Sequence, residues 1–221
     1  MMDFDAAREQ MVDTQVRPNS VSNHAVIGQF LSVPRERFVP EDRMALAYID
    51  DDVAVAETTE GDRNIMNAMM LSKLVQFAEV QSTHFVLDIG CASGYSSAIF
   101  SGLAESVVAV EAHVDLVEKA TNTLQDLGCD NVAVVTRPLT EGCPSEAPFD
   151  VIFLGGAVEV VPQTLFDQLR DGGVLVTVEG HGNAGRAMKY RKVGDVVSSE
   201  EGFNASVKPL PGFEKPREFV F

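Results

Sequence analysis

The stretch FVLDIGCASGYSSAIFSGLAESVVAVE, residues 85–111, decides the fold. Its apolar start, Phe85–Ile89, has the β-branched content and the length of a buried strand. A small-residue turn, Gly90–Gly94, follows, and residues 95–103 then carry helical spacing. A second β-branched run ends in Glu111. The stretch therefore predicts a strand, a glycine turn, a helix and a second strand that ends in an acid.

The turn favours a ligand that carries a nucleoside but no pyrophosphate. Glycines let the backbone approach a ligand at a helix N-terminus, and an acid after the second strand accepts hydrogen bonds from a ribose diol. A dinucleotide fingerprint reads G-x-G-x-x-G, but here the middle glycine is Ala92 and the last would be Tyr95. S-adenosylmethionine is a nucleoside ligand without a pyrophosphate. The alternative is a Rossmann-like unit whose glycines only permit packing.

Composition indicates one globular domain with a large negative charge. The 221 residues are 45% hydrophobic and 23% charged, which suffices for a sizeable core. A net charge of −16 repels phosphates, so we expect neither nucleic-acid binding nor docking to anionic membranes. No apolar run approaches the roughly 18 residues that span a bilayer.

Cysteine and histidine usage favours a cytoplasmic protein without a metal site. The first ten residues carry no secretory signal, and Cys91, Cys129 and Cys143 form no C-x-x-C pair, so reduced thiols are the simple interpretation. The four histidines lack ligand spacing. The acidic run at residues 50–52 is interpreted as a solvated loop, because no oxygen-ligand pattern follows it.

Apolar spacing predicts alternating helices and strands in the rest of the chain, which favours parallel crossovers. The expected helices are Asp3–Val16, Asn23–Leu31, Glu41–Ala47, Asn64–Ala78, Tyr95–Leu103, Val114–Leu127 and Pro162–Arg170. The further expected strands are Asn131–Thr136, Phe149–Leu154, Val174–Val178, Ala187–Val193 and Asn204–Pro209, with residues 155–157 as a turn and residues 214–221 as a last extended piece.

The segment VLDIGCASGY, residues 86–95, resembles the first motif of the class I methyltransferases, roughly V-L-D/E-I/V-G-x-G-S/T-G-Y. The resemblance implies a Rossmann-like α/β fold, with a mostly parallel central sheet flanked by helices. It implies that Asp88 lies near the methionine end of S-adenosylmethionine and that Glu111 holds the ribose. The cofactor-binding residues that follow from it are Asp88, Gly90, Cys91, Ala92, Ser93, Gly94 and Glu111, and the product is S-adenosylhomocysteine.

Three N-terminal pieces resemble one branch of that group, the protein-L-isoaspartate O-methyltransferases. The family patterns M-V-x-x-Q-L-R, V-P-R-x-x-F-V-P and A-Y-x-D correspond to residues 11–17, 33–40 and 47–50, with Val16 in place of the leucine. The resemblance implies methyl transfer to the carboxylate of isoaspartyl residues in damaged proteins, hence a protein-repair enzyme whose partner is a protein or peptide substrate. It also implies an N-terminal helical cap on the sheet.

We expect a single domain over residues 1–221 with three parts. Residues 1–80 form the helical cap and acceptor loop, residues 81–193 the cofactor-binding core, and residues 194–221 the C-terminal strands. The oligomeric state is left open by the sequence.

Two departures from the family pattern concern the acceptor and the adenine. The family loop T-I-S-Q-P, whose serine lies beside the transferred methyl, matches Asn64–Ala68, so Ile65, Met66 and Asn67 stand at its centre. Met66 replaces the serine and cannot donate a hydrogen bond. A hydroxyl from Thr58, Thr59 or Ser72 is the alternative. The family's G-D-G after the third strand is residues 137–139, Arg-Pro-Leu, so the adenine contact is missing or comes from elsewhere.

Three functions remain open. The first is an isoaspartyl-type carboxyl methyltransferase with another group in place of the serine. The second is a relative that binds the cofactor but methylates a different acceptor or none. The third is a nucleotide-dependent oxidoreductase, which the missing glycines and the lack of a substrate domain disfavour. A carboxylate acceptor needs no general base, so the absence of a recognisable catalytic constellation does not argue against an enzyme.

Overall fold

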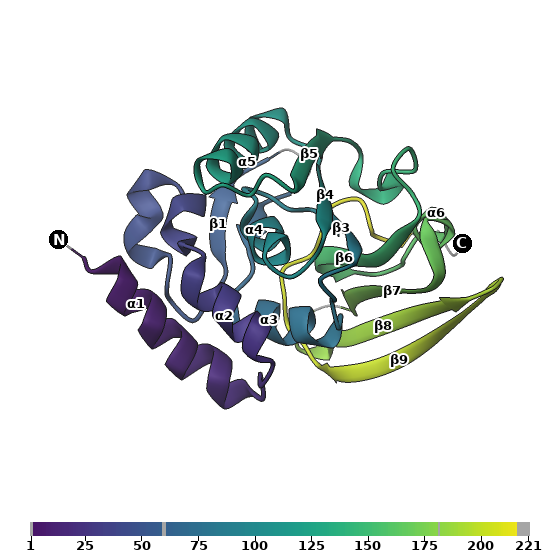
Figure 1. Ribbon diagram of the computed structural model, residues 1–221, viewed down its shortest axis with the longest axis horizontal. Coiled ribbons are helices and arrows are strands. Elements are labelled where there is room, and N and C mark those ends of the chain that lie inside the picture. The colour runs from purple at the N-terminus through teal and green to yellow at the C-terminus, as the bar shows by residue number, and fades with distance from the viewer. Residues whose placement is uncertain (1, 59–60, 181, 216–221) are drawn as a thin grey trace, which may run out of the picture.

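The computed structural model describes residues 2–58, 61–180 and 182–215 and has a central seven-stranded sheet of order β5-β4-β3-β6-β7-β8-β9 (Figure 1). Strands β5, β4, β3, β6 and β7 run parallel, whereas β8 and β9 are antiparallel to their neighbours. The bounds are β3 Phe85–Ile89, β4 Ser106–Glu111, β5 Val132–Thr136, β6 Phe149–Val158, β7 Leu169–Glu179, β8 Arg186–Val193 and β9 Val196–Asn204. A separate two-stranded sheet pairs β1 Val53–Ala56 with β2 Arg63–Ile65.

Helices surround this sheet, and the N-terminal ones lie at the end opposite the β8–β9 hairpin (Figure 1). The α-helices are α1 Phe4–Met11, α2 His24–Ser32, α3 Ala68–Phe77, α4 Tyr95–Ser101, α5 Val114–Asp126 and α6 Gln163–Asp167. A π-helical turn, η1 Val12–Val16, continues α1, and the 3₁₀ turns are η2 Arg17–Asn19, η3 Arg35–Phe38, η4 Glu41–Leu46, η5 Leu139–Glu141 and η6 Gly182–Ala184. In the described ranges, no helix combines the length and the apolar character needed to cross a membrane.

The alternation of side chains along the strands divides the core into two layers. Val86 of β3 packs with the residues of the N-terminal helices and α4, whereas Leu87 and Ile89 pack on the opposite face with η5 and α6. Leu210 and Phe213, from the segment that follows β9, complete that second layer. The central strands β3, β4 and β6 are therefore buried on both faces, as their near-continuous apolar sequences indicate.

The parallel sheet, its helices and the N-terminal helical region confirm the predicted fold class. The helix expected over Asn64–Ala78 is too long, because Asn64 and Ile65 belong to β2 and the α-helix begins at Ala68. The hairpin of β1 and β2 was not predicted, since both of its strands are short and lie in a polar stretch. The helix expected to reach Arg170 ends at Asp167, and β7 begins at Leu169 with a register shift before Val174.

Two glycines expected to turn the chain instead lie inside β6, which runs on to Val158. A Cβ at Gly155 would lie 2.9 Å from the carbonyl oxygen of Gly90, so this glycine permits close packing of β6 on the end of β3. In the part of the chain that the structure describes, the last strand is β9, at Val196–Asn204, and not residues 204–209 as expected. Residues 216–221, expected to be extended, lie outside the described residues.

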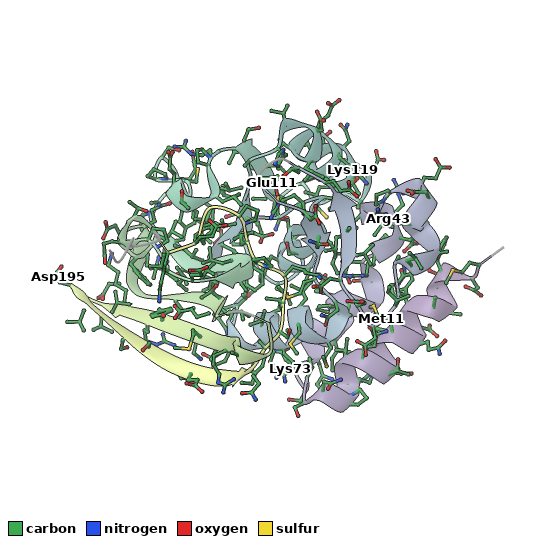
Figure 2. All side chains as sticks on the ribbon, turned by 180° about the vertical axis from the view of Figure 1, so that it is seen from behind. Met11, Arg43, Lys73, Glu111, Lys119 and Asp195 are labelled. Carbon is green, nitrogen blue, oxygen red and sulfur yellow. The ribbon has the colours of Figure 1, made fainter. Side chains whose placement is uncertain are left out.

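The segment from Ala205 to Phe213 runs across the carboxyl ends of the parallel strands, where it forms only one isolated bridge. Ala157 of β6 donates to the carbonyl of Lys208 at 2.9 Å, and Leu210 donates to the carbonyl of Ala157 at 2.7 Å. Figure 2 shows this segment crossing the molecule on the side where Glu111 is labelled. The segment therefore lies at the carboxyl ends of the strands, where parallel α/β proteins bind ligands.

Candidate functional site

The predicted cofactor turn lies where β3 ends and α4 begins. Gly90, Ala92 and Gly94 have φ angles of 79°, 51° and 97°, and Gly94 precedes the first residue of α4. These left-handed positions suit glycine and are uncommon for alanine. Gly90 donates to the carbonyl of Val110 at 2.8 Å, so the turn is attached to the end of β4. The strand, turn, helix and acid therefore meet as the sequence predicts.

Asp88 lies fully buried beneath this turn. Its Oδ2 accepts hydrogen bonds from Ser96 at 2.7 Å and Ser97 at 2.6 Å, both in the first turn of α4. Its Oδ1 has no hydrogen-bond partner among the described residues. Burial raises the pKa of Asp88 to about 6, against the opposing effect of the two serine hydroxyls. The free oxygen is the kind of buried acceptor that a bound cationic group satisfies.

Glu111, the predicted ribose acid, is fully buried and has a complete set of donors. Its Oε1 accepts from the backbone N–H groups of Ala112 at 2.9 Å and His113 at 3.3 Å, and Oε2 accepts from Ala92 at 2.9 Å. Arg63, also buried, donates to Oε2 from Nη2 at 2.7 Å and from Nε at 3.2 Å. An ionised carboxylate offers about four lone-pair positions, so little acceptor capacity remains.

The space directly over Gly90 contains two side chains from other segments. A Cβ at Gly90 would lie 2.5 Å from Cδ1 of Leu210 and 3.1 Å from Nη2 of Arg63. Leu210 is 2% exposed and Arg63 is 4% exposed. The remaining gap between the turn and the acceptor loop holds about 20 Å³, which is room for one water molecule.

Two other predicted turn residues face inward. Ser93 is buried and its hydroxyl donates to the carbonyl of Phe38 at 2.5 Å, which joins the turn to the N-terminal region. Cys91 is buried as well and lies beside the 20 Å³ gap. Burial raises the pKa of the Cys91 thiol well above its ordinary value, so this cysteine stays protonated.

The predicted acceptor loop lies next to the turn. Ile65 and Met66 are buried and line the same gap as Tyr95 and Ser96. The family resemblance led us to expect this loop beside the transferred methyl, and Gly90 of the turn also lines the gap. Among the alternative hydroxyls, Ser72 is buried and donates to the carbonyl of Met69 at 3.0 Å. Thr58 donates to the carbonyl of Gly61 at 2.5 Å, and Thr59 lies outside the described residues.

Asn67, the third predicted loop residue, begins α3. Its side-chain Oδ1 accepts from the N–H of Met70 at 2.9 Å, as an N-cap does. Asp52 accepts from the backbone of Asn67 at 2.7 Å and from its side chain at 3.0 Å. The solvated-loop interpretation therefore holds for Asp50 and Asp51, which are exposed, but not for Asp52. No cluster of possible metal ligands occurs in the part of the chain that the structure describes.

Two clefts adjoin the site. One, of about 500 Å³, lies beyond Glu111 and is lined by Ala112, His113, Pro138, Leu139 and Pro211 among others. Its lining includes residues 137–139, which stand where the family pattern has the G-D-G of the adenine end. The other, of about 510 Å³, lies beside the acceptor loop and has acidic walls. Its charged lining residues are Asp51, Asp52, Asp62, Glu214 and Lys208.

Three residues that shape the site were not identified from the sequence: Asp52, Arg63 and Leu210. Arg63 carries the one available signal, a single arginine between the acidic stretch that ends at Asp62 and the uncharged run that leads into α3. Leu210 stands between two prolines and gives no functional signal. Its position depends on how the C-terminal segment folds back on the sheet.

A family model described as protein-L-isoaspartate(D-aspartate) O-methyltransferase matches residues 6–207. A protein-L-isoaspartate O-methyltransferase of Roseiflexus sp. (strain RS-1) is 32% identical over 211 residues, covering 96% of this chain and 94% of the relative. Protein-L-isoaspartate O-methyltransferase 1 of Syntrophobacter fumaroxidans is 34% identical over 180 residues, covering 81% of this chain and 82% of the relative.

Solved structures agree at the level of the fold. One protein-L-isoaspartate O-methyltransferase superposes with a TM-score of 0.80 at 24% identity, covering 93% of this chain and 66% of that chain. A Plasmodium falciparum protein assigned to the same type, in complex with S-adenosyl-L-homocysteine, gives 0.75 at 18% identity, covering 95% and 99%. With the family model spanning most of the sequence, this chain belongs to the protein-L-isoaspartate O-methyltransferase family.

Proposed function

We propose that this protein is an S-adenosylmethionine-dependent O-methyltransferase that acts on the free carboxylate of isoaspartyl residues in proteins. The observation that carries the proposal is the left-handed turn at Gly90–Gly94 beside a buried acid at the end of β4, in a chain that the family model matches over residues 6–207. A relative assigned to the same type of enzyme is in complex with the demethylated cofactor.

The residues present fit this cofactor, although two side chains lie in its path. The Oδ1 of Asp88, which has no partner in the described part of the chain, suits the ammonium group of a methionine moiety. The cleft of about 500 Å³ beyond Glu111 has room for a purine. Glu111 is held by three backbone N–H groups in the position of a ribose acceptor. Arg63 and Leu210 must leave the space over Gly90 before the cofactor can enter.

When bound, the cofactor supplies a methyl group activated by a sulfonium. The chain's part is to position the acceptor in line with that methyl and to exclude water, since an ionised carboxylate needs no general base. Gly90 and Gly94 keep the turn backbone accessible, Asp88 binds the methionine portion and Glu111 the ribose, and the loop at Ile65–Asn67 presents the acceptor.

A second candidate differs only in the acceptor. Met66 fills the position at which the family pattern has a serine, and it offers no hydrogen bond to a carboxylate. The adjoining cleft is lined by Asp51, Asp52 and Asp62 together with Glu214, against one lysine, so it repels an anionic acceptor. Both observations favour an acceptor that is neutral or positively charged.

The experiment measures transfer of labelled methyl from S-adenosylmethionine to two peptides of one sequence, one with isoaspartate and one with aspartate. We expect label only in the isoaspartyl peptide. Label that appears instead in a lysine-rich peptide, with neither aspartyl form modified, would favour the second candidate. Absence of both transfer and binding of S-adenosylhomocysteine would contradict the proposed function.

The net charge of the chain and its free cysteine thiols support the proposed partners and location. A net charge of −16 supports a protein substrate without a nucleic-acid partner. The cysteines Cys91, Cys129 and Cys143 are all free, which suits the reducing cytoplasm.

The division into a helical cap at residues 1–80, a cofactor core at 81–193 and a C-terminal part at 194–221 remains part of this proposal. Size-exclusion chromatography with light scattering would measure the oligomeric state.

A further inference from the structure

We propose that Arg63 and Leu210 form an internal plug over the glycine turn, and that S-adenosylmethionine must displace both side chains in order to bind. The inference rests on the proposed function and adds to it a closed ligand-free state. The two residues come from segments far apart in sequence, β2 and the stretch after β9, and they meet over Gly90.

Arg63 donates to the carboxylate of Glu111, the acid to which the cofactor ribose is proposed to bind. Both of its contacts to Glu111, at 2.7 Å and 3.2 Å, reach Oε2, which also accepts from Ala92. Both side chains are removed from solvent, so their attraction is screened less than that of a surface pair. A ribose diol bound to Glu111 would have to replace these contacts. Cofactor binding and the Arg63–Glu111 ion pair are therefore mutually exclusive.

Leu210 fills the place where the backbone of the turn is open. Glycine at position 90 would let a ligand approach the chain, but Cδ1 of Leu210 stands 2.5 Å from the position of a Cβ there. The leucine is held by the hydrogen bond from its own N–H to Ala157 and by close packing against Gly156. Leu210 thus contributes to the core of the ligand-free protein and blocks the turn at the same time.

The space around the plug agrees with a closed state. The cleft beyond Glu111 measures about 500 Å³, whereas the gap between the turn and the acceptor loop measures about 20 Å³. An adenine therefore has room while the ribose and methionine portions do not. Because only molecules with the plug displaced can bind, the apparent affinity is the intrinsic affinity reduced by the open fraction.

Calorimetry with S-adenosylhomocysteine on Arg63→Gln, Leu210→Ala and the double variant tests the plug. Arg63→Gln keeps the three backbone donors of Glu111, so the acid is not left bare. Arg170→Gln is the matched control: it removes one arginine from the opposite edge of the sheet, where Arg170 pairs with Asp150. We expect each single plug variant to bind more tightly than wild type, the double variant at least tenfold more tightly, and the control unchanged.

Hydrogen–deuterium exchange on the wild type supplies a readout that does not depend on the variants folding. Saturating S-adenosylhomocysteine should speed exchange across residues 205–213, because the Leu210 N–H loses its bond to Ala157, while β3 is protected. Equal affinities for wild type and double variant, or slower exchange in 205–213, would overturn the plug and leave the proposed function intact. No binding to any variant would overturn both.

Discussion

One carboxylate oxygen of Asp52 accepts two hydrogen bonds from Asn67, from the backbone N–H at 2.7 Å and from the side-chain amide at 3.0 Å. The amide oxygen of the same asparagine accepts from the N–H of Met70 and caps α3. Asn67 thus connects the acidic run at residues 50–52, the acceptor loop and the first turn of α3. The position of the neighbouring Met66 depends on these hydrogen bonds of Asn67.

Asn67→Ala should lower the free energy of unfolding by about 1–2 kcal/mol, because the N-cap and the amide bond to Asp52 are both lost. Asn64→Ala is the matched control: among the described residues, the Asn64 amide donates only to the carbonyl of Asp62, at 3.3 Å near the surface. Urea denaturation of both variants checks this. An equal change in unfolding free energy at the two positions would show that the hydrogen bonds of Asn67 do not stabilise the fold more than those of Asn64.

Glu111→Ala should destabilise the fold by about 3–5 kcal/mol, since it leaves the Arg63 guanidinium buried without a counter-charge. A loss of cofactor affinity in this variant alone would therefore not isolate a ribose contact. Removing both charges with Arg63→Met and Glu111→Gln should cost less than Glu111→Ala. A double-mutant cycle by urea denaturation measures the coupling.

The exposed pair Arg17–Asp13 serves as the control for that cycle. Its side chains are 47% and 68% exposed and lie 3.0 Å apart, so their coupling should stay below about 1 kcal/mol. Coupling of the same small size for Arg63 and Glu111 would contradict the importance assigned to their burial.

Asp88 should make the protein less stable as pH rises from about 4 to about 6. Its pKa is about 6 in the folded chain and 3.8 ordinarily, so the folded state holds more protons than the unfolded state in this window. The unfolding free energy of wild type relative to Asp88→Asn should fall by about 3 kcal/mol across it and level off above pH 7. Urea denaturation at several pH values checks the curve.

The serines beside Asp88 give that prediction a second check. Ser97 donates to Oδ2 at 2.6 Å and opposes the effect of burial on the pKa. Ser97→Ala should therefore raise the pKa of Asp88 in the folded chain further and extend the upper end of the window of falling stability to higher pH. A shift to lower pH would mean that the hydroxyl does not stabilise the carboxylate.

Local patterns were enough to predict the elements that carry strong periodicity. The strand at Phe85–Ile89, the turn at Gly90–Gly94 and the acid at Glu111 are contiguous, so spacing alone places them together. The prediction of a strand at residues 204–209 was wrong. The alternating apolar residues there, Ala205 and Val207, are buried, but the segment pairs with the sheet only through one isolated bridge at Pro209 among the described residues. Gly155 was misread as a turn because its role depends on the backbone of Gly90.

The contacts inside the site could not be predicted from one sequence. Arg63 is 48 residues from Glu111, and nothing in the local pattern of either says that the two charges meet. Leu210 reaches Gly90 only after the chain has completed β8 and β9. Both contacts are tertiary, and they decide whether a turn with cofactor-binding chemistry is open or closed.

Met66→Ser should raise methyl transfer to an isoaspartyl peptide above the slow turnover that we expect of the wild type. The change shortens a buried thioether beside Tyr95 and Ser96 and supplies a donor to the acceptor carboxylate. Since a displacement of about 1 Å at a reacting centre costs on the order of a hundredfold in rate, we expect at least tenfold faster transfer. Binding of S-adenosylhomocysteine should change little, because its predicted contacts lie on the turn.

Met69→Ser is the matched control for Met66→Ser, because Met69 is the second residue of α3, is partly buried and does not line the gap. It tests whether a serine anywhere in this segment loosens the loop and thereby speeds turnover. The assay counts labelled methyl transferred at saturating cofactor, with calorimetry on the same samples. Robust turnover by wild type that Met66→Ser leaves unchanged would show that the missing serine does not limit the reaction, and that the acceptor carboxylate is held by another group.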